Sequence, residues 1–198
     1  ARDVQFLREG ARRGEPVLYV TLSETEEELR SVAGSHGWPL EGATVRELIP
    51  TEGTLLADEQ YTMFHPSEVE LSETTKTILE DLSRLKPTRV VFYSLSELRL
   101  LAGNALRYRR QILALKQFFA GLSCTVLLLD DLTSASHDLQ VQSIAHGVVR
   151  LEQMYPMYGA ERRRLIVLKM RGARFRGGYH DFTIKRGDRY PSFSSDLS

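Results

Sequence analysis

Two kinds of hydrophobic pattern alternate along the first two thirds of the chain. Short, continuous apolar runs are typical of strands that are covered on both faces. Such runs lie at residues 17–22, 89–93 and 125–129, and residues 45–49 are a further strand candidate. Between them, apolar positions recur three or four residues apart, which is the spacing of an amphipathic helix. The alternation of strand and helix predicts βαβ units and a parallel sheet.

Local signals place the helices more closely. Thr25 followed by Glu28 is a capping box, which predicts a helix from this point to about His36. A second helix is expected to start at Ser72 and to end before Pro87. Further helices are predicted over residues 3–10 and 106–120, and residues 50–66 show no clear period.

The pattern changes after residue 147. Strands are predicted at 148–151, 165–169 and 182–185, separated by glycine-containing turns. Successive strands joined by turns indicate an antiparallel extension at the C-terminal edge of the sheet. Because no repeat and no linker divides the sequence, residues 1–198 are expected to form a single domain of the α/β class.

Charge and composition narrow the set of partners. The chain has 26 Lys and Arg against 26 Asp and Glu, so no overall field attracts nucleic acid or an anionic membrane. No apolar run approaches the ~18 residues that a membrane span needs. The single Cys124 cannot form an internal disulfide and suits a reducing compartment. We therefore expect a cytoplasmic protein that has neither membranes nor nucleic acid as partners.

Polar side chains follow several of the predicted strands. In an open parallel sheet, ligands bind beyond the carboxyl ends of the strands. Four strand ends carry candidate groups: Ser23 with Glu24, Tyr93 with Ser94, Asp130 with Asp131, and Lys169 with Arg171 and Gly172. Turns and caps also favour such residues, but acids and bases at several ends together predict a ligand site.

Four stretches of the chain resemble the KaiC branch of the RecA-like ATPases. They are G-E-P-V-L-Y-V-T-L-S-E at 14–24, R-V-V-F-Y-S-L-S-E-L at 89–98, S-I-A-H-G-V-V-R-L-E at 143–152, and K-M-R-G at 169–172. The resemblance implies a RecA-like, mostly parallel sheet flanked by helices, with the antiparallel strands at its C-terminal edge. It also implies ATP and Mg²⁺ as ligands, and a homo-oligomeric ring in which a hexamer is favoured.

The phosphate-binding loop of this family, G-x-x-x-x-G-K-[ST], does not occur in the sequence. The resemblance would place it directly before the helix at 3–10. The expectation is therefore that residues 1–198 are a domain truncated just after its P-loop.

The resemblance also assigns roles to the strand ends. Glu24 stands where the family has the carboxylate that activates the attacking water, although a solvated residue before a helix cap is the alternative. The family's Mg²⁺-binding Asp is replaced by Tyr93, whose neutral phenol is a poor ligand for Mg²⁺. Ser94 and Asp130 are the substitute metal ligands, unless Asp130 and Asp131 only solvate a loop.

Lys169 and Arg171 lie two residues apart on a predicted strand, so both cations face the same side. The resemblance implies that this Lys-x-Arg-Gly segment, which ends at Gly172, reaches the nucleotide held by a neighbouring subunit. A surface pair without a ligand is the alternative.

The resulting hypothesis is an ATPase domain that binds and hydrolyses ATP at subunit interfaces, impaired here by Tyr93 and the absent P-loop. A non-catalytic pseudo-ATPase that serves oligomerisation or signalling is the alternative. A DNA-binding recombinase-like protein has the right fold, but the balanced charge argues against it.

Overall fold

The computed structural model describes residues 2–48, 66–131, 139–184, 186–187 and 192–193. The chain divides into two compact units, residues 1–137 and residues 138–198, and each is described by itself. The predicted polar stretch at 50–66 lies almost entirely outside the described residues.

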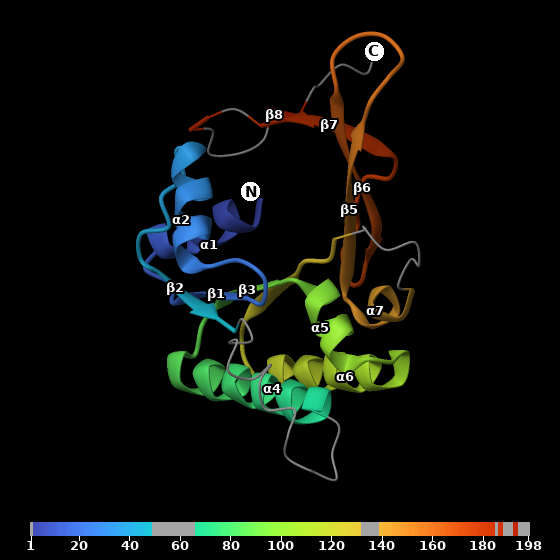
Figure 1. Cartoon of the computed structure of the whole chain (residues 1–198). Helices are drawn as coiled ribbons and strands as arrows, with labels where there is room; N and C mark the ends of the chain where they lie inside the picture. The colour runs from blue at the N-terminus through green and yellow to red at the C-terminus, as the bar shows by residue number, and fades with distance from the viewer. Residues whose placement is uncertain (1, 49–65, 132–138, 185, 188–191, 194–198) are drawn as a thin grey trace. The chain divides into compact units, whose positions relative to one another are not determined.

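The first unit contains a parallel four-stranded sheet in the order β2-β1-β3-β4 (Figure 1). Its elements along the chain are α1 (Arg2–Arg12), β1 (Val17–Thr21), α2 (Glu26–Ser35), β2 (Ala43–Glu47), α4 (Pro66–Leu85), β3 (Arg89–Tyr93), α5 (Leu95–Ala102), α6 (Ala105–Ala120) and β4 (Thr125–Leu128). The parallel α/β fold predicted from the hydrophobic pattern is confirmed.

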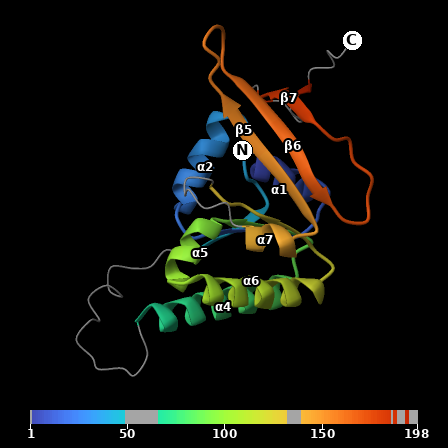
Figure 2. The same cartoon turned by 90° about the vertical axis from the view of Figure 1, so that its right-hand side faces the viewer.

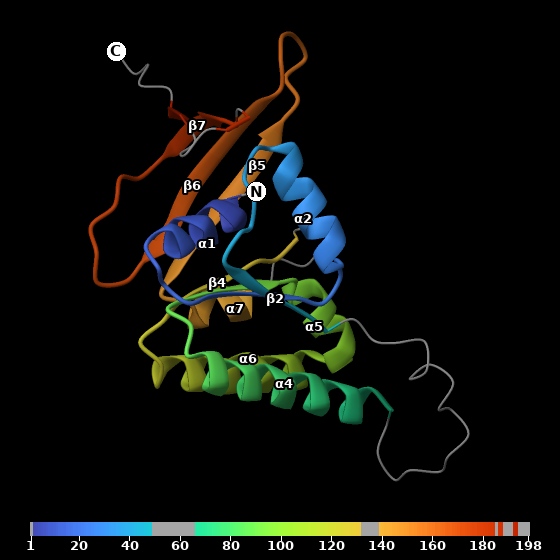
Figure 3. The ribbon, with the colours of Figure 1, turned by 90° about the vertical axis from the view of Figure 1, so that its left-hand side faces the viewer.

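Helices cover both faces of this sheet. Figure 3 shows α1 and α2 on one side and α4 and α6 on the other. The central strands β1 and β3 supply the core, since Val17–Val20 and Val90–Phe92 are all buried. Against them pack fully buried side chains of the helices, including Leu7, Leu82 and Leu115. A sheet enclosed on both faces explains why its central strands are continuous apolar runs.

The edge strand β4 differs from this expectation. The sequence predicts a strand buried on both faces, but Thr125 is exposed and residues 126–129 are only partly buried. The prediction of burial was wrong for this strand. Its apolar run resembles that of β3, yet β4 lies at the end of the strand order and has β3 as its one partner strand in this sheet.

Capping residues set the limits of the helices. The predicted capping box is present, because the Thr25 side chain accepts from the Glu28 N–H and the Glu28 side chain accepts from the Thr25 N–H. Helix α5 was not predicted. It begins at Ser94, whose hydroxyl accepts from the Glu97 N–H, and ends at Gly103, which adopts the left-handed conformation at φ 66°.

Arg89, a partly buried residue of β3, fastens α1 to the sheet. The Arg89 guanidinium lies 2.6 Å from the Glu15 carboxylate and donates a 3.0 Å hydrogen bond to the carbonyl oxygen of Phe6. The same group lies over the Phe6 ring, 5.0 Å from its centroid. Gly10 is required beside it, because a Cβ at this position would lie 2.7 Å from Arg89 and from Val17.

The second unit is an antiparallel sheet in the order β5-β6-β7-β8, preceded by a short helix. Its elements are α7 (Leu139–Ile144), β5 (Gly147–Met154), β6 (Arg162–Met170), β7 (Tyr179–Thr183) and β8 (Ser192–Phe193). The predicted antiparallel strands are confirmed, and they form a sheet of their own. Strands β5 and β6 make a long hairpin (Figure 2).

Among the described residues, the structure has no helix with the length and apolar character needed to cross a bilayer.

Candidate functional site

The carboxyl ends of three parallel strands meet at one edge of the first sheet. Thr21, the last residue of β1, is in register with Tyr93, the last residue of β3. The chain continues this pairing, since the Leu22 N–H donates to the carbonyl oxygen of Tyr93 at 2.8 Å. Leu95 in turn donates to the Leu129 carbonyl after β4. The residues that follow β1, β3 and β4 are therefore brought to one place, as the sequence predicts.

The turn that carries Glu24 is held by the buried side chain of Thr21. Its hydroxyl accepts from the Glu24 N–H at 2.9 Å and donates to the Glu24 carbonyl at 2.9 Å. The backbone at Glu24 is thereby fixed to the end of β1, while its carboxyl group stays half-buried. Burial raises the pKa of Glu24, and the negative charge of Asp3 raises it further. This carboxyl group thus holds a proton more strongly than an ordinary glutamate.

Tyr93 and Asp131 are joined across the ends of β3 and β4. The phenol donates a 3.0 Å hydrogen bond to Oδ2 of Asp131. Burial, together with this bond to an anionic acceptor, raises the pKa of Tyr93 to about 12. The phenol is therefore neutral at physiological pH and acts as a hydrogen-bond donor to Asp131.

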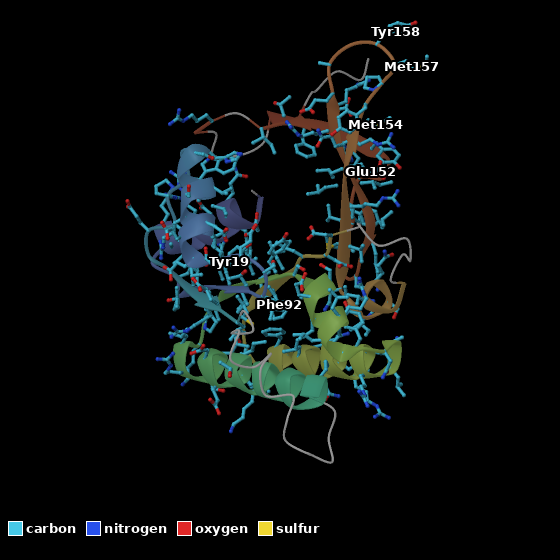
Figure 4. All side chains as sticks on the ribbon, viewed as in Figure 1. Tyr19, Phe92, Glu152, Met154, Met157 and Tyr158 are labelled. Atoms are coloured by element: carbon cyan, nitrogen blue, oxygen red, sulfur yellow. The ribbon has the colours of Figure 1, made fainter. Side chains whose placement is uncertain are left out.

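A second phenol–carboxylate pair lies beneath the same edge. Tyr19, from the middle of β1, donates a 3.0 Å hydrogen bond to Asp3 in the first turn of α1 (Figure 4). Both residues are buried, and burial followed by the charge of Asp3 raises the pKa of Tyr19 strongly. Asp3 also lies where the helix dipole favours a negative charge.

We refer to these residues as the acid–phenol cluster: Asp3, Tyr19, Glu24, Tyr93 and Asp131. Their charges act on one another, since Asp3 and Asp131 both raise the pKa of Glu24, and Glu24 raises that of Tyr93. Each phenol in the cluster donates to a carboxylate, whereas Glu24 has no phenol partner of this kind among the described contacts. Glu24 thus differs from Asp3 and Asp131, each of which accepts a hydrogen bond from a phenol.

The two candidate metal ligands have other partners. Ser94 is almost fully buried, and its hydroxyl caps α5. Asp130 forms an ion pair with Arg99 at 2.9 Å, and its remaining oxygen, Oδ1, is buried without a hydrogen-bond partner among the described residues. Hard cations such as Mg²⁺ need accessible anionic oxygens. These two residues therefore do not fit a Mg²⁺ site beside Tyr93.

No group of three or more His, Cys, Asp or Glu side chains in the described part of the chain is arranged to hold a metal ion. Two carboxylates of the acid–phenol cluster, Asp3 and Asp131, accept hydrogen bonds from phenols.

Lys169 and Arg171 share one partner in the second unit. The Lys169 ammonium donates to the carbonyl oxygens of Gln142 at 2.8 Å and Ser143 at 3.1 Å. Arg171 donates to the same Ser143 carbonyl at 3.0 Å. Both cations therefore lie at the carboxyl end of α7, where the helix dipole favours positive charge. Gly172 follows in the left-handed conformation, at φ 75°.

Sequence reasoning proposed Glu24 as a site residue but missed much of its surroundings. Asp131 faces Tyr93, although Asp130 was the candidate, because adjacent residues at a strand end point in different directions. Asp3 and Tyr19 were not singled out. A polar residue in the first turn of α1 and a tyrosine inside a buried run were the signals, since a buried phenol usually needs a partner.

Comparisons with known proteins agree with one another. A model of the family described as "ATPase: KaiC" matches residues 3–188. A UPF0273 protein of Methanopyrus kandleri is 28% identical over 190 residues, which cover 91% of this chain and 73% of the relative. A UPF0273 protein of Pyrococcus furiosus is 29% identical over 191 residues, covering 91% and 75%.

Two further proteins carry KaiC in their names. The circadian clock oscillator protein KaiC of Picosynechococcus is 28% identical over 192 residues, which cover 92% of this chain and 34% of that protein. The crystal structure of a KaiC-like protein from Pyrococcus horikoshii superposes with a TM-score of 0.73 at 21% identity. That match covers 96% of this chain and 82% of the other, and it supports the RecA-like fold.

Proposed function

Since this chain belongs to the KaiC family of ATPases, we propose that it is an ATPase domain working at the interfaces between subunits of a ring, with slow hydrolysis. The observation that carries the proposal is the position of Glu24. It lies at the carboxyl edge of the parallel sheet, half-buried among acidic groups that raise its pKa. A carboxylate with a raised pKa is a stronger base for a water molecule at neutral pH.

In the proposed reaction, ionised Glu24 accepts a proton from water as the water oxygen bonds to the γ-phosphorus of ATP. The bond from that phosphorus to the bridging oxygen breaks, and ADP and inorganic phosphate leave. The Thr21 hydroxyl keeps the Glu24 backbone in place through bonds of 2.9 Å in both directions. A fixed base lowers the entropic cost of aligning the water.

The slow rate follows from Tyr93. The neutral phenol supplies no charge for Mg²⁺, which in related reactions neutralises the phosphates, and the nearby Ser94 and Asp130 have other partners. The residues at this edge therefore give the transferring phosphoryl group less electrostatic support than an aspartate in place of Tyr93 would.

Lys169 and Arg171 are the proposed cations for a nucleotide held by the neighbouring subunit. They already lie together at the end of α7, bound to backbone carbonyls. Each such bond contributes about 0.5–1.5 kcal/mol, more for a charged donor. Phosphate oxygens carry negative charge and are stronger acceptors than neutral carbonyl oxygens. The two cations can therefore exchange these carbonyls for phosphate oxygens when nucleotide binds.

A non-catalytic module is the second candidate, and the Tyr93–Asp131 bond favours it. The neutral phenol of Tyr93 donates a hydrogen bond to the Asp131 carboxylate, which stabilises the acidic sheet edge without a metal. In that case Glu24 only contributes to the acidic edge.

The two candidates are separated by measuring phosphate release. Because residues 1–198 contain no P-loop pattern, the assay uses a protein in which a P-loop strand and loop precede residue 1. Slow turnover that is abolished by Glu24→Gln supports the ATPase. Nucleotide binding without turnover supports the non-catalytic module. Turnover that is unchanged by Glu24→Gln would overturn the role of Glu24 as the base. The 198-residue chain itself is expected to bind ATP weakly or not at all in calorimetry, because P-loop N–H groups supply most phosphate affinity.

A further inference from the structure

The loop of the β5–β6 hairpin presents large apolar side chains to solvent. Met157 is 92% exposed and Tyr158 is 88% exposed, and Met154 and Tyr155 beside them are exposed as well. Figure 4 shows Met157 and Tyr158 at the far end of the hairpin. We call these four residues the hairpin tip. Single exposed apolar residues are ordinary, but a group of four on one loop marks an interaction site.

The hairpin below the tip is held rigid by side chains on one face of the sheet. Arg164 forms a 2.6 Å ion pair with Glu152, and its guanidinium carbon lies 3.8 Å above the Tyr179 ring centroid. Arg150 pairs with the same Glu152 at 2.8 Å and also donates to the Tyr179 hydroxyl. These contacts link β5, β6 and β7. Because these contacts restrict the β5–β6 hairpin, it loses little conformational freedom when its tip binds a partner.

The charges beside the tip are paired within the hairpin region. Arg163 bonds to Glu161, and Arg162 bonds to Asp181. The three consecutive arginines 162–164 therefore each have an acidic partner. Tyrosine and methionine are enriched where proteins bind proteins, and the neutralised arginines give little attraction for phosphate backbones or anionic lipid.

A second exposed apolar site occurs on the same chain, at the turn between α5 and α6. Leu100 is 73% exposed and Leu106 is 60% exposed. Arg110, one helical turn after Leu106, is exposed on the same side of α6. We call these three residues the α5–α6 corner. Leucines beside a guanidinium complement the hairpin tip, because methionine packs on leucine and tyrosine rings attract cations.

We propose that the hairpin tip of one copy of this chain docks on the α5–α6 corner of a second copy. The two surfaces differ, so the contact is head-to-tail and each subunit carries one of each. The proposal does not require nucleotide. It names the surfaces through which the subunits of the proposed ring assemble, and in that respect it rests on the proposed function.

The experiment measures association of the 198-residue chain by sedimentation velocity over a concentration series without nucleotide. The tip variant is Met157→Ser with Tyr158→Ser, and the corner variant is Leu100→Ser with Leu106→Ser. Val32→Ser is the matched control, since Val32 is an exposed apolar residue of α2 outside both surfaces. Circular dichroism of each variant checks folding, which these exposed positions should not disturb.

The wild type and the control are expected to associate, and each double variant should weaken association ~10-fold or more. The decisive step is to mix the two variants. The tip variant keeps an intact corner and the corner variant keeps an intact tip, so the mixture should form 1:1 dimers that grow no further. A wild type that stays monomeric, a mixture that stays monomeric, or a tip variant that associates normally would overturn the proposal.

A vesicle assay tests the alternative that the hairpin tip binds a membrane. Wild type that stays monomeric but sediments with phosphatidylcholine vesicles, and loses this in the tip variant, would show a membrane contact and overturn the proposal. Failure of the association leaves the ATPase assay unaffected, because phosphate release and its loss in Glu24→Gln are measured separately. Conversely, an inactive protein that still shows the mixed 1:1 dimer leaves the docking surfaces supported.

Discussion

The hydroxyl of Tyr93 donates a 3.0 Å hydrogen bond to the carboxylate of Asp131, across the ends of two neighbouring parallel strands. The family resemblance leads one to expect a metal-binding aspartate at the position of Tyr93. A neutral phenol occupies it instead and donates its hydrogen bond to Asp131. The bond links the fold to the proposed slow chemistry, because the same contact that stabilises Asp131 removes a ligand for Mg²⁺.

Replacing Tyr93 by Asp should create a divalent-cation site. The variant would place a new carboxylate beside Asp131 and near Glu24, and like charges at this distance repel when no cation is present. We expect Tyr93→Asp to lower the melting temperature of the 198-residue chain in EDTA and Mg²⁺ to restore part of the loss. Thermal unfolding followed by circular dichroism, with and without millimolar Mg²⁺, measures both effects.

Tyr93→Phe is the matched control for this change. It removes the hydroxyl but adds no charge, so its melting temperature should fall without any response to Mg²⁺. If the Asp variant also fails to respond to Mg²⁺, the edge formed by β3 and β4 does not gather carboxylates as described.

Glu24→Gln should increase the stability of the fold near neutral pH although it lowers activity. Burial raises the pKa of Glu24 above the 4.5 of an ordinary glutamate. Between that pH and the higher folded pKa, the folded chain therefore binds more protons than the unfolded chain. The stability from this proton is present at low pH and is lost as the pH rises through the window. The glutamine variant should therefore unfold at higher temperature than wild type near pH 7, and the advantage should vanish below about pH 4.

The same variant tests the base in the P-loop-containing protein. Turnover should fall ~10²-fold or more, the usual contribution of a positioned general base. In wild type, the rate should decrease as the pH is lowered through the raised pKa of Glu24. Persistence of that pH dependence in the glutamine variant would assign it to another group.

Arg171→Ala should impair hydrolysis on the neighbouring subunit while changing nucleotide affinity little. A cation that acts on a neighbour's phosphates contributes ~10³-fold or more to the rate, and the neighbour's own P-loop still holds the nucleotide. Mixing the Arg171→Ala protein with the Glu24→Gln protein should restore activity, because some interfaces then contain both intact residues. No recovery in demonstrably mixed rings would confine Arg171 to its own subunit, where its bond to Ser143 gives it a structural role.

Arg89→Ala should destabilise the first unit more than loss of an exposed ion pair. Arg89 and Glu15 are largely buried, and removal of the guanidinium leaves the Glu15 carboxylate and the Phe6 carbonyl without this partner. We expect a loss of ~1–3 kcal/mol in the free energy of unfolding, measured by urea titration. Arg12→Ala is the control, since Arg12 is well exposed in its pair with Glu9 and should cost less than ~1 kcal/mol. Equal losses in the two variants would contradict the role of Arg89 in fastening α1.

Local interactions determined much of the fold from the sequence alone. The limits of β3 and the capping box of Thr25 and Glu28 were predicted correctly, because a buried apolar run and a side chain that caps its own helix depend on neighbours in sequence. The capping signal at Ser94 depends on the same physics. The helix that it caps, α5, has eight residues and was not predicted from the sequence.

Tertiary structure decided the features that depend on what lies beside a residue. The apolar run of β4 is as continuous as that of β3, but its place at the end of the strand order leaves it partly exposed. Strand order arises from pairing between segments that are distant in sequence, so a local hydrophobic pattern does not predict it.

The candidate site likewise combines features that the sequence determined with features that only the tertiary structure decided. The sequence determined that polar groups gather at the carboxyl ends of the strands, because that follows from parallel connection alone. Only the tertiary structure decided that Asp131, and not Asp130, meets Tyr93, since Asp130 pairs with Arg99 instead. The spacing of Lys169 and Arg171 predicted a common side on one strand, but β6 ends at Met170 and Arg171 lies just beyond it. The partner that the two cations share, the Ser143 carbonyl, depended on a six-residue helix too short to leave a periodic signal.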